Sequence, residues 1–273
     1  MNGFIKQLLT KASGNRTAQR LLERNIALAH SLMGIGAGAD TRSSGESAIF
    51  RELRRLAKPP YCIFDVGANR GEFVAMTLEQ LQGAECQIHA FEPSRPTYAM
   101  LSERFGNRPS IQLNLYGLGQ QVEERSLYYD AEGSGLASLT KRRLDHFDIQ
   151  FTKSEQVSID TLDRYCSMHG IGHIHLLKLD VEGHELDVLH GGAVLLRDKS
   201  VDLVSFEFGG CNIDTRTYFQ EFFYFFAEQG MRLHRITPSG YLVPVLRYSE
   251  VHEQFVTTNF LAVKDSQKIE QGL

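Results

Sequence analysis

The sequence predicts an α/β fold in which a mostly parallel sheet carries helices on both faces. From residue 61 onward, short apolar runs alternate with segments of helical periodicity, a pattern typical of such a sheet. The first apolar run ends at Asp65, and Gly67 and Gly71 follow it before a helical pattern begins. A strand–loop–helix unit of this kind lets a ligand approach the backbone, so we expect a binding site at its loop.

The order of the elements follows from this alternation. Helices are expected where apolar residues recur at helical spacing, and strands where short apolar runs end near glycine, proline or polar residues. Between 117 and 155 the pattern is less regular, with one strand at 126–129. The predicted strands are 61–65, 87–91, 111–115, 157–159, 175–180, 201–207, 231–236 and 255–263, and the predicted helices are 72–82, 96–105, 160–168, 184–196 and 218–226.

The start of the chain is predicted to be helical. In the stretch 1–33, Leu22, Ile26 and Met33 fall on one face of a helix, which predicts packing on the chain's own domain or on a second copy. A weaker alternative assigns a membrane-surface role to the first apolar residues, Phe4, Ile5, Leu8 and Leu9.

Glycine and serine residues between 34 and 45 predict a flexible connection to this helix. A short helix is expected at 46–56, and two prolines end it before the first strand. The predicted organisation is an extension with its linker at 1–58, a core domain at 59–265 and a C-terminal tail at 266–273.

Composition narrows the classes of function. Of the 273 residues, 42% are hydrophobic and 23% charged, as in ordinary globular proteins, and the net charge of −4 gives no sign of nucleic-acid binding. The four cysteines are widely spaced, which argues against a disulfide framework or a zinc site. No apolar run approaches the roughly 20 residues that span a bilayer, and no signal peptide is recognisable. We therefore expect a cytoplasmic protein without a transmembrane segment.

Four predicted strands end in an acid, namely Asp65, Glu92, Asp180 and Glu207. Ligands bind at the carboxyl ends of strands in a doubly wound sheet, so the four acids together favour one site, although capping of the next helix explains each alone equally well. Asp65 would repel a diphosphate, which favours S-adenosylmethionine, a ligand with an ammonium and a sulfonium group. Glu92 follows Gly71 at the distance expected of an acid that binds ribose hydroxyls.

Five motifs in sequence order resemble the FkbM family of S-adenosylmethionine-dependent methyltransferases. They are DVGANRG at 65–71, FEP at 91–93, VSIDTLD at 157–163, LKLDVEGHE at 177–185 and FE at 206–207. The resemblance covers about 60–263 and implies a class I methyltransferase (Rossmann-like) fold. Such a fold has a seven-stranded sheet, mostly parallel, with an antiparallel last strand that 255–263 would supply. The resemblance also implies methylation of a hydroxyl on a sugar, a glycan or a natural product.

The same resemblance implies a set of donor-binding residues. The segment 116–120 stands where the family usually has an alanine–leucine–small–acid run, so the chain departs from the family pattern at the adenine contacts. The residues expected to bind the donor are Asp65, Gly67, Asn69, Gly71, Glu92, Pro93, Ser94, Leu118 and Asp180.

Methylation of an alcohol requires a base within hydrogen-bond reach of the hydroxyl. His184 is the first candidate, because it begins a helix just after Asp180 and histidine is the side chain best suited to accept a proton near neutrality; the alternative is an exposed residue in a first helical turn. Asp180 is expected to hold the donor's ammonium group or orient the acceptor, and Glu207 to point into the same cleft. Asp180, Glu207 and Asn212 also offer oxygen ligands for Mg²⁺ or Ca²⁺, an alternative that is not favoured.

Two other functions stay open, namely methylation of RNA or protein, and donor binding without catalysis. His169, His173 and His175 match no zinc spacing, and the basic cluster 141–143 is interpreted as a solvated face in preference to a phosphate site. The expected partners are a small-molecule or glycan acceptor and a second copy of the chain, bound through the N-terminal helices.

Overall fold

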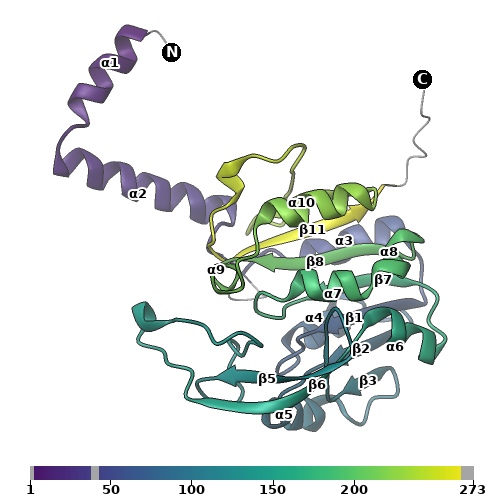
Figure 1. Ribbon diagram of the computed structural model, residues 1–273. Helices are drawn as coiled ribbons and strands as arrows, with labels where there is room; N and C mark the ends of the chain where they lie inside the picture. The colour runs from purple at the N-terminus through teal and green to yellow at the C-terminus, as the bar shows by residue number, and fades with distance from the viewer. Residues whose placement is uncertain (1–2, 38–42, 266–273) are drawn as a thin grey trace.

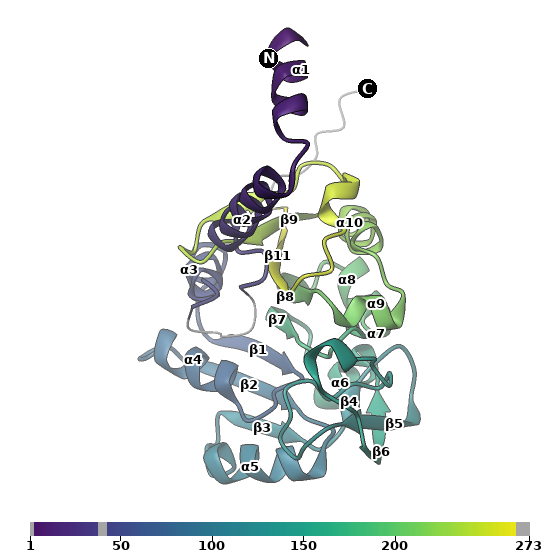
Figure 2. The ribbon, with the colours of Figure 1, turned by 90° about the vertical axis from the view of Figure 1, so that its left-hand side faces the viewer.

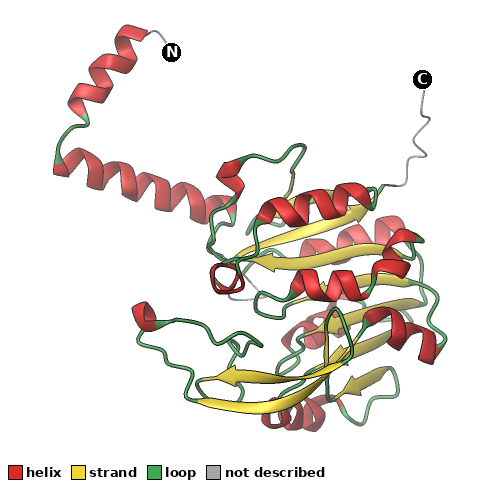
Figure 3. Ribbon diagram, in the orientation of Figure 1, coloured by secondary structure: helices red, strands yellow, loops and turns green. Residues whose placement is uncertain are grey.

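A computed structural model describes residues 3–37 and 43–265 of the chain. At its centre is an eight-stranded sheet of order β10-β9-β11-β8-β7-β1-β2-β3 (Figure 3). The strands are β1 (Tyr61–Val66), β2 (Cys86–Phe91), β3 (Ile111–Asn114), β7 (Ile174–Leu179), β8 (Val201–Phe208), β9 (Met231–Ile236), β10 (Leu242–Pro244) and β11 (Thr258–Lys264).

The sheet has the mixed topology expected from the sequence. Strands β3, β2, β1, β7 and β8 are parallel, and β11 lies antiparallel between β8 and β9, which confirms the antiparallel last strand. The predicted number of seven strands is wrong, because β10, in the excursion after β9, pairs antiparallel with β9 as an additional edge strand. Strand order reverses between β1 and β7, which is where a doubly wound sheet binds its ligands.

Helices cover both faces of this sheet (Figures 1 and 2). Successive side chains of a strand point to opposite faces, so Ile63 packs in one core and Phe64 in the other. The Ile63 core contains α3 (Ser47–Leu56), α4 (Glu72–Gln80) and α5 (Arg95–Phe105). The Phe64 core contains α6 (Leu162–His169), α7 (Glu185–Gly191), α8 (Ala193–Arg197) and α10 (Phe219–Glu228). The short helix α9 (Cys211–Thr215) follows β8.

The irregular middle section contains a second sheet of three strands, ordered β4-β6-β5. They are β4 (Gly117–Leu118), β5 (Glu123–Tyr129) and β6 (Lys153–Asp160), and β5 pairs antiparallel with β6. Leu127, Val157 and Ile159 form a small core of their own. A short 3₁₀ helix at Asp145–Phe147 lies between β5 and β6, and another at Glu250–His252 lies before β11.

The N-terminal segment projects from the rest of the molecule (Figure 1). The predicted single helix is two helices, α1 (Gly3–Ala12) and α2 (Arg16–Met33), because Asn15 breaks it: its Oδ1 accepts a hydrogen bond from the Ala18 N–H at 3.0 Å and caps α2. No residue of α2 is buried, so packing of this helix on its own domain, the first of the two expected alternatives, is wrong, and packing on a second copy stays a prediction. The side chains of Phe4, Ile5 and Leu8 lie outside the described residues.

Two other predicted elements differ from the structure, and two predicted segments lie outside the described residues. The predicted helix 184–196 is two helices that meet at Gly192, where an added Cβ would lie 2.7 Å from Leu162 of α6. Helix α3, expected in the extension, is packed into the body through buried Ile49, Phe50 and Leu53. The tail 266–273 and part of the connection, 38–42, lie outside the described residues. Within the described ranges, no helix has the length and apolar character needed to cross a bilayer.

Candidate active site

The glycine loop after β1 lies against the end of β7. Gly67 has a φ of 84°, and a Cβ there would lie 1.9 Å from the carbonyl oxygen of Asp180, so only glycine fits. The Asp180 N–H donates to the Val66 carbonyl at 2.9 Å, which fixes the two strand ends together. Gly71, with φ 82°, begins α4, and a Cβ there would collide with the ring of Phe105. The loop therefore stays close to both elements and leaves its outer side open.

Asp65 is buried beneath this loop, with 1% of its surface exposed. Burial raises the pKa of its carboxyl group to about 7, against the opposing effect of the Lys178 ammonium. Its Oδ2 has no hydrogen-bond partner among the described residues. A cavity of about 360 Å³ opens here, lined by Asp65, Gly67, Lys178 and Asp180. An unpartnered buried carboxylate oxygen beside a cavity suits a ligand that brings positive charge.

Glu92, at the end of β2, is held by two backbone N–H groups. Its Oε2 accepts from Asn69 at 2.9 Å and its Oε1 from Ser94 at 2.9 Å, and the residue is 7% exposed. Burial raises the pKa of Glu92 to about 7, although both hydrogen bonds oppose the shift. Asn69 has a φ of 47°, which turns its N–H toward the carboxylate. Each oxygen of Glu92 keeps a second lone pair for a hydroxyl of a ligand.

Most of the residues expected to bind the donor lie around one cavity. It is bounded by the end of β2, by β4, and by the loop 134–139 after β5. This cavity and the one beside Asp65 are here called the donor-side cavities. Pro93 and Leu118 line the first of these, whereas Ser94 does not: the Ser94 hydroxyl donates to Glu155 at 2.8 Å, away from the cavity. Of the residues expected from the sequence, Gly67, Asn69, Glu92, Pro93, Leu118, Asp180 and His184 line this cavity.

A third cavity, of about 310 Å³, is acidic and is here called the acceptor cavity. It shares Asp180 with both cavities described above. Glu182 and Glu207 line it together with Glu46 and Arg142. Burial, and then the neighbouring charge of Asp180, raise the pKa of Glu182 to about 8 and that of Glu207 well above its usual range. Glu182 is therefore able to take up a proton near neutrality, and Glu207 holds its proton to a higher pH than an exposed carboxyl group does.

Three residues that line the acceptor cavity were missed from the sequence. Glu46, 1% exposed, lies 3.6 Å from the Lys178 ammonium, and Glu182 pairs with the buried Arg142. The interpretation of 141–143 as a solvated face is wrong for Arg142, whose side chain is 7% exposed, and holds for Arg143, which is 88% exposed. A lysine inside the apolar run 174–179 was the available signal, because a buried cation requires acidic partners.

His184 is buried, not exposed in a first helical turn. It is 8% exposed, its Nε2 lies 3.0 Å from the Thr140 hydroxyl, and its Nδ1 lies 2.7 Å from Asp187. It lines the donor-side cavity and is absent from the residues around the acceptor cavity. Both ring nitrogens are thus engaged by protein groups.

Asn212, the third oxygen ligand considered for a metal, uses its amide oxygen within the chain. Its Oδ1 accepts from the Gly209 N–H at 2.8 Å, and the residue is fully buried. It does not line the acceptor cavity, whereas Asp180 and Glu207 do. Asn212 therefore holds the turn after β8.

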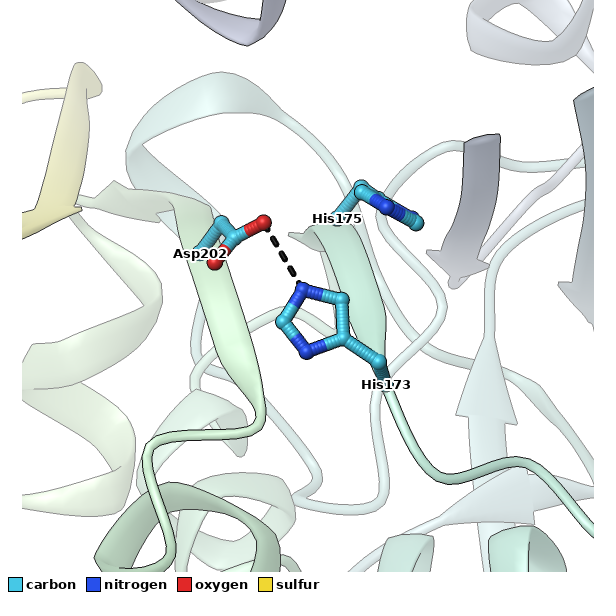
Figure 4. A group of neighbouring side chains, drawn as sticks. All are labelled: His173, His175 and Asp202. Atoms are coloured by element: carbon cyan, nitrogen blue, oxygen red, sulfur yellow. Dashed lines mark hydrogen bonds and ion pairs between the residues drawn. The ribbon is translucent and has the colours of Figure 1, made fainter. Parts of the chain in front are cut away.

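The part of the chain that the structure describes contains one group of metal-ligand type, His173, His175 and Asp202 (Figure 4). His173 Nε2 lies 2.8 Å from Asp202 Oδ2, whereas the Cys62 N–H donates to His175 Nδ1 at 2.9 Å. That bond places the proton of neutral His175 on Nε2, so neither nitrogen is free to bind a metal. The group lies at the amino ends of β7 and β8, opposite the acidic strand ends.

Comparisons with known proteins find methyltransferases among the proteins that are similar to this chain. The chain is 28% identical over 147 residues to the 2-O-methyltransferase NoeI of Sinorhizobium fredii. This alignment covers 50% of the chain and 59% of that protein. The chain is also 26% identical over 168 residues to the hexuronic acid methyltransferase AglP of Haloferax volcanii. This alignment covers 60% of the chain and 64% of that protein. The matches thus span about three fifths of the length of either relative.

A crystal structure of methyltransferase FkbM from Methylobacillus flagellatus matches with 14% identity and a TM-score of 0.45, over 88% of this chain and 59% of that one. The sequence profile of the methyltransferase FkbM domain matches residues 65–233, more than half of the chain, so the chain belongs to the FkbM methyltransferase family.

Proposed function

We propose that this chain transfers a methyl group from S-adenosylmethionine to a hydroxyl of a sugar. The observation that carries the proposal is that Asp180 lines both the donor-side cavities and the acceptor cavity, so that two ligands can meet at its carboxylate. The printed functions of the two relatives, 2-O-methylation and methylation of a hexuronic acid, support a sugar acceptor.

The donor fits the cavities on the β1–β2 side. Glu92 would offer its second lone pairs to the ribose hydroxyls, and Leu118, which lines the same cavity, would cover the adenine. The unpartnered oxygen of Asp65, with Asp180 beside it, faces the cavity that would receive the ammonium group. Gly67 lets this part of the ligand approach the backbone.

Glu207 is our candidate for the base. Bound S-adenosylmethionine would supply an electrophilic methyl group, which the acceptor oxygen takes as the carbon–sulfur bond breaks. The hydroxyl proton passes to Glu207, whose raised pKa makes it a stronger base than an exposed carboxylate. Asp180, which lines the same cavity, orients the hydroxyl. His184, engaged by Thr140 and Asp187, serves to hold the wall of the cavity that Leu118 lines.

The charges around the acceptor cavity favour a neutral acceptor. The two cations that line it already face acids, Lys178 facing Glu46 and Arg142 facing Glu182. Glu207 adds a further buried carboxyl group. A uronate would bring another negative charge into this cavity without a free cation to pair with it. Sugar hydroxyls, which donate hydrogen bonds to carboxylates, suit the cavity better.

A test combines calorimetry with a labelled-donor assay on the full chain. We expect binding of S-adenosylmethionine, and transfer of its ¹³C-labelled methyl group to a neutral methyl glycoside in preference to a methyl glucuronide or an RNA oligonucleotide. Glu207→Gln should lower the rate of transfer by about 10²–10⁴-fold and leave donor affinity unchanged. The control Glu228→Gln alters an exposed acid on α10. Absence of donor binding would overturn the proposal, as would labelling of RNA alone.

A cytoplasmic location, with a small-molecule or glycan acceptor, belongs to the same proposal. The acceptor cavity is enclosed by side chains of the chain itself, which supports an acceptor of the size of a sugar. A divalent metal is not part of the proposal, because Asn212, one of its three expected ligands, is engaged by Gly209.

A further inference from the structure

Helix α2 leaves a broad apolar face uncovered. At about 100° per residue, its six large apolar side chains fall within an arc of roughly 160°, which also contains Asn25, and its charged side chains all lie outside that arc. The large apolar residues are between 40% and 71% exposed. They are Leu21, Leu22, Ile26, Leu28, Leu32 and Met33. An 18-residue helix that exposes such a face needs a surface to cover it.

The opposite face of α2 is basic. Arg16, Arg20 and Arg24 lie along it and are exposed, and Lys6 and Lys11 of α1 continue the basic character. The stretch 1–33 contains five basic residues and one acid, whereas the whole chain has a net charge of −4, so the remainder is more acidic still. A cationic amphipathic extension on an acidic body is the pattern of a helix that lies on an anionic membrane surface.

The width of the apolar face distinguishes a membrane from a second copy. Two paired helices bury a narrow seam of two positions per heptad, and an arc of about 160° would remain largely exposed in such a pair. A helix that lies flat in a lipid interface covers the whole arc, while its arginines reach the headgroups.

The C-terminal end of α2 is attached to the body close to the acceptor cavity. Arg235 donates a hydrogen bond to the Met33 carbonyl at the end of the helix, and the Gly36 N–H donates to the Thr257 carbonyl at 2.9 Å. Thr257 lines the acceptor cavity. A membrane that held α2 would therefore lie near the cavity in which we propose that the sugar binds.

We propose that α2 binds the surface of a membrane that contains anionic lipids, with its apolar face in the lipid and its arginines at the headgroups. The binding itself does not depend on the proposed catalytic function. The full chain, mixed with vesicles of phosphatidylcholine containing phosphatidylglycerol, should sediment with them, and more weakly with vesicles of phosphatidylcholine alone or at high salt.

Variants on the two faces of α2 give the sharpest test. The double variant Leu21→Glu, Leu28→Glu should abolish sedimentation, and Arg20→Gln, Arg24→Gln should weaken vesicle affinity about fivefold per charge removed. Leu246→Glu, at an 85% exposed leucine on the body, and Arg143→Gln, at an 88% exposed arginine, are the matched controls and should leave vesicle affinity unchanged.

Two results would overturn the proposal. One is equal sedimentation of the wild type and the Leu21→Glu, Leu28→Glu variant. The other is absence of vesicle binding by a chain that forms a dimer in buffer, if the same double variant dissociates that dimer; α2 would then be a contact between two copies. Donor binding, measured by calorimetry on the same preparations, should be intact in every variant, so a failure here is separable from a failure of the proposed function.

Discussion

The ammonium group of Lys178 lies 3.6 Å from a carboxylate oxygen of Glu46, and neither side chain is more than 3% exposed. Glu46 precedes α3, whereas Lys178 is near the end of β7, so the pair joins the start of the body to the centre of the sheet. Burial alone would lower the pKa of Lys178, but nearby carboxylates, led by Asp180 and Glu46, raise it above its usual value. Lys178 therefore stays charged beneath the site.

Removal of this cation should destabilise the fold. Lys178→Met leaves the buried Glu46 without its cationic partner, and we expect the free energy of unfolding to fall by about 3–5 kcal/mol in urea titrations. The control is Lys153→Met, because Lys153 lies 3.8 Å from Glu132 in an exposed pair, worth about 1 kcal/mol or less. Equal losses in the two variants would show that the Lys178 pair has no special role in stability.

Neighbouring arginines in the loop after β5 should differ in the same way. Arg142 is buried between Glu182 and Asp214, so Arg142→Ala leaves two acids facing each other and should cost about 3–5 kcal/mol. Arg143→Ala removes an 88% exposed side chain and should change stability by less than about 1 kcal/mol. Thermal unfolding of the two variants decides the matter, and a stable Arg142→Ala protein would contradict the role of the pair.

These two cations show where prediction from the sequence stops. The strand-end acids Asp65, Glu92 and Glu207 could be located, because a strand end is a local pattern and parallel strands end at one edge of the sheet. Lys178 also lies 3.3 Å from Asp180, two residues on, but its partner Glu46 and the partners of Arg142 come from distant segments that no local pattern identifies. The eighth strand was missed for a related reason: Leu242–Pro244 is too short to show alternation and forms only because β9 offers an edge.

Glu92 should contribute directly to donor binding. Glu92→Gln keeps the side chain's size and one acceptor oxygen but removes the charge that strengthens bonds to the ribose hydroxyls, so we expect about tenfold weaker binding of S-adenosylmethionine or S-adenosylhomocysteine. Glu155→Gln is the matched control: Glu155 binds the Ser94 hydroxyl and does not line the cavity. Isothermal calorimetry measures both affinities. If the two variants bind alike, Glu92 does not contact the ribose.

Asp65 should make donor affinity depend on pH. Its pKa, about 7 because of burial, means that much of the free protein carries a neutral Asp65 at pH 6 and an ionised one at pH 8. The ammonium group of the donor favours the ionised form, so affinity should rise between pH 6 and pH 8. Asp65→Asn should remove this part of the rise and leave only the part that comes from Glu92, whose pKa is also about 7. Calorimetry between pH 6 and pH 8 measures the donor affinity of the wild type and of this variant.

The free energy of unfolding should also depend on the ionisation of Asp65, but it should fall, not rise, as the pH increases. The folded-state pKa of Asp65 lies above its ordinary value of 3.8, so the folded chain binds the proton more tightly than the unfolded chain does. Its contribution to stability is full below about pH 4 and is lost as the pH rises through 7. Asp65→Asn, which cannot ionise, should therefore be more stable than the wild type at pH 8, by a margin of the order of 4 kcal/mol. That margin should shrink toward pH 4. A margin that is independent of pH in urea titrations would mean that Asp65 keeps one protonation state throughout, and the rise in donor affinity would then need another titrating group.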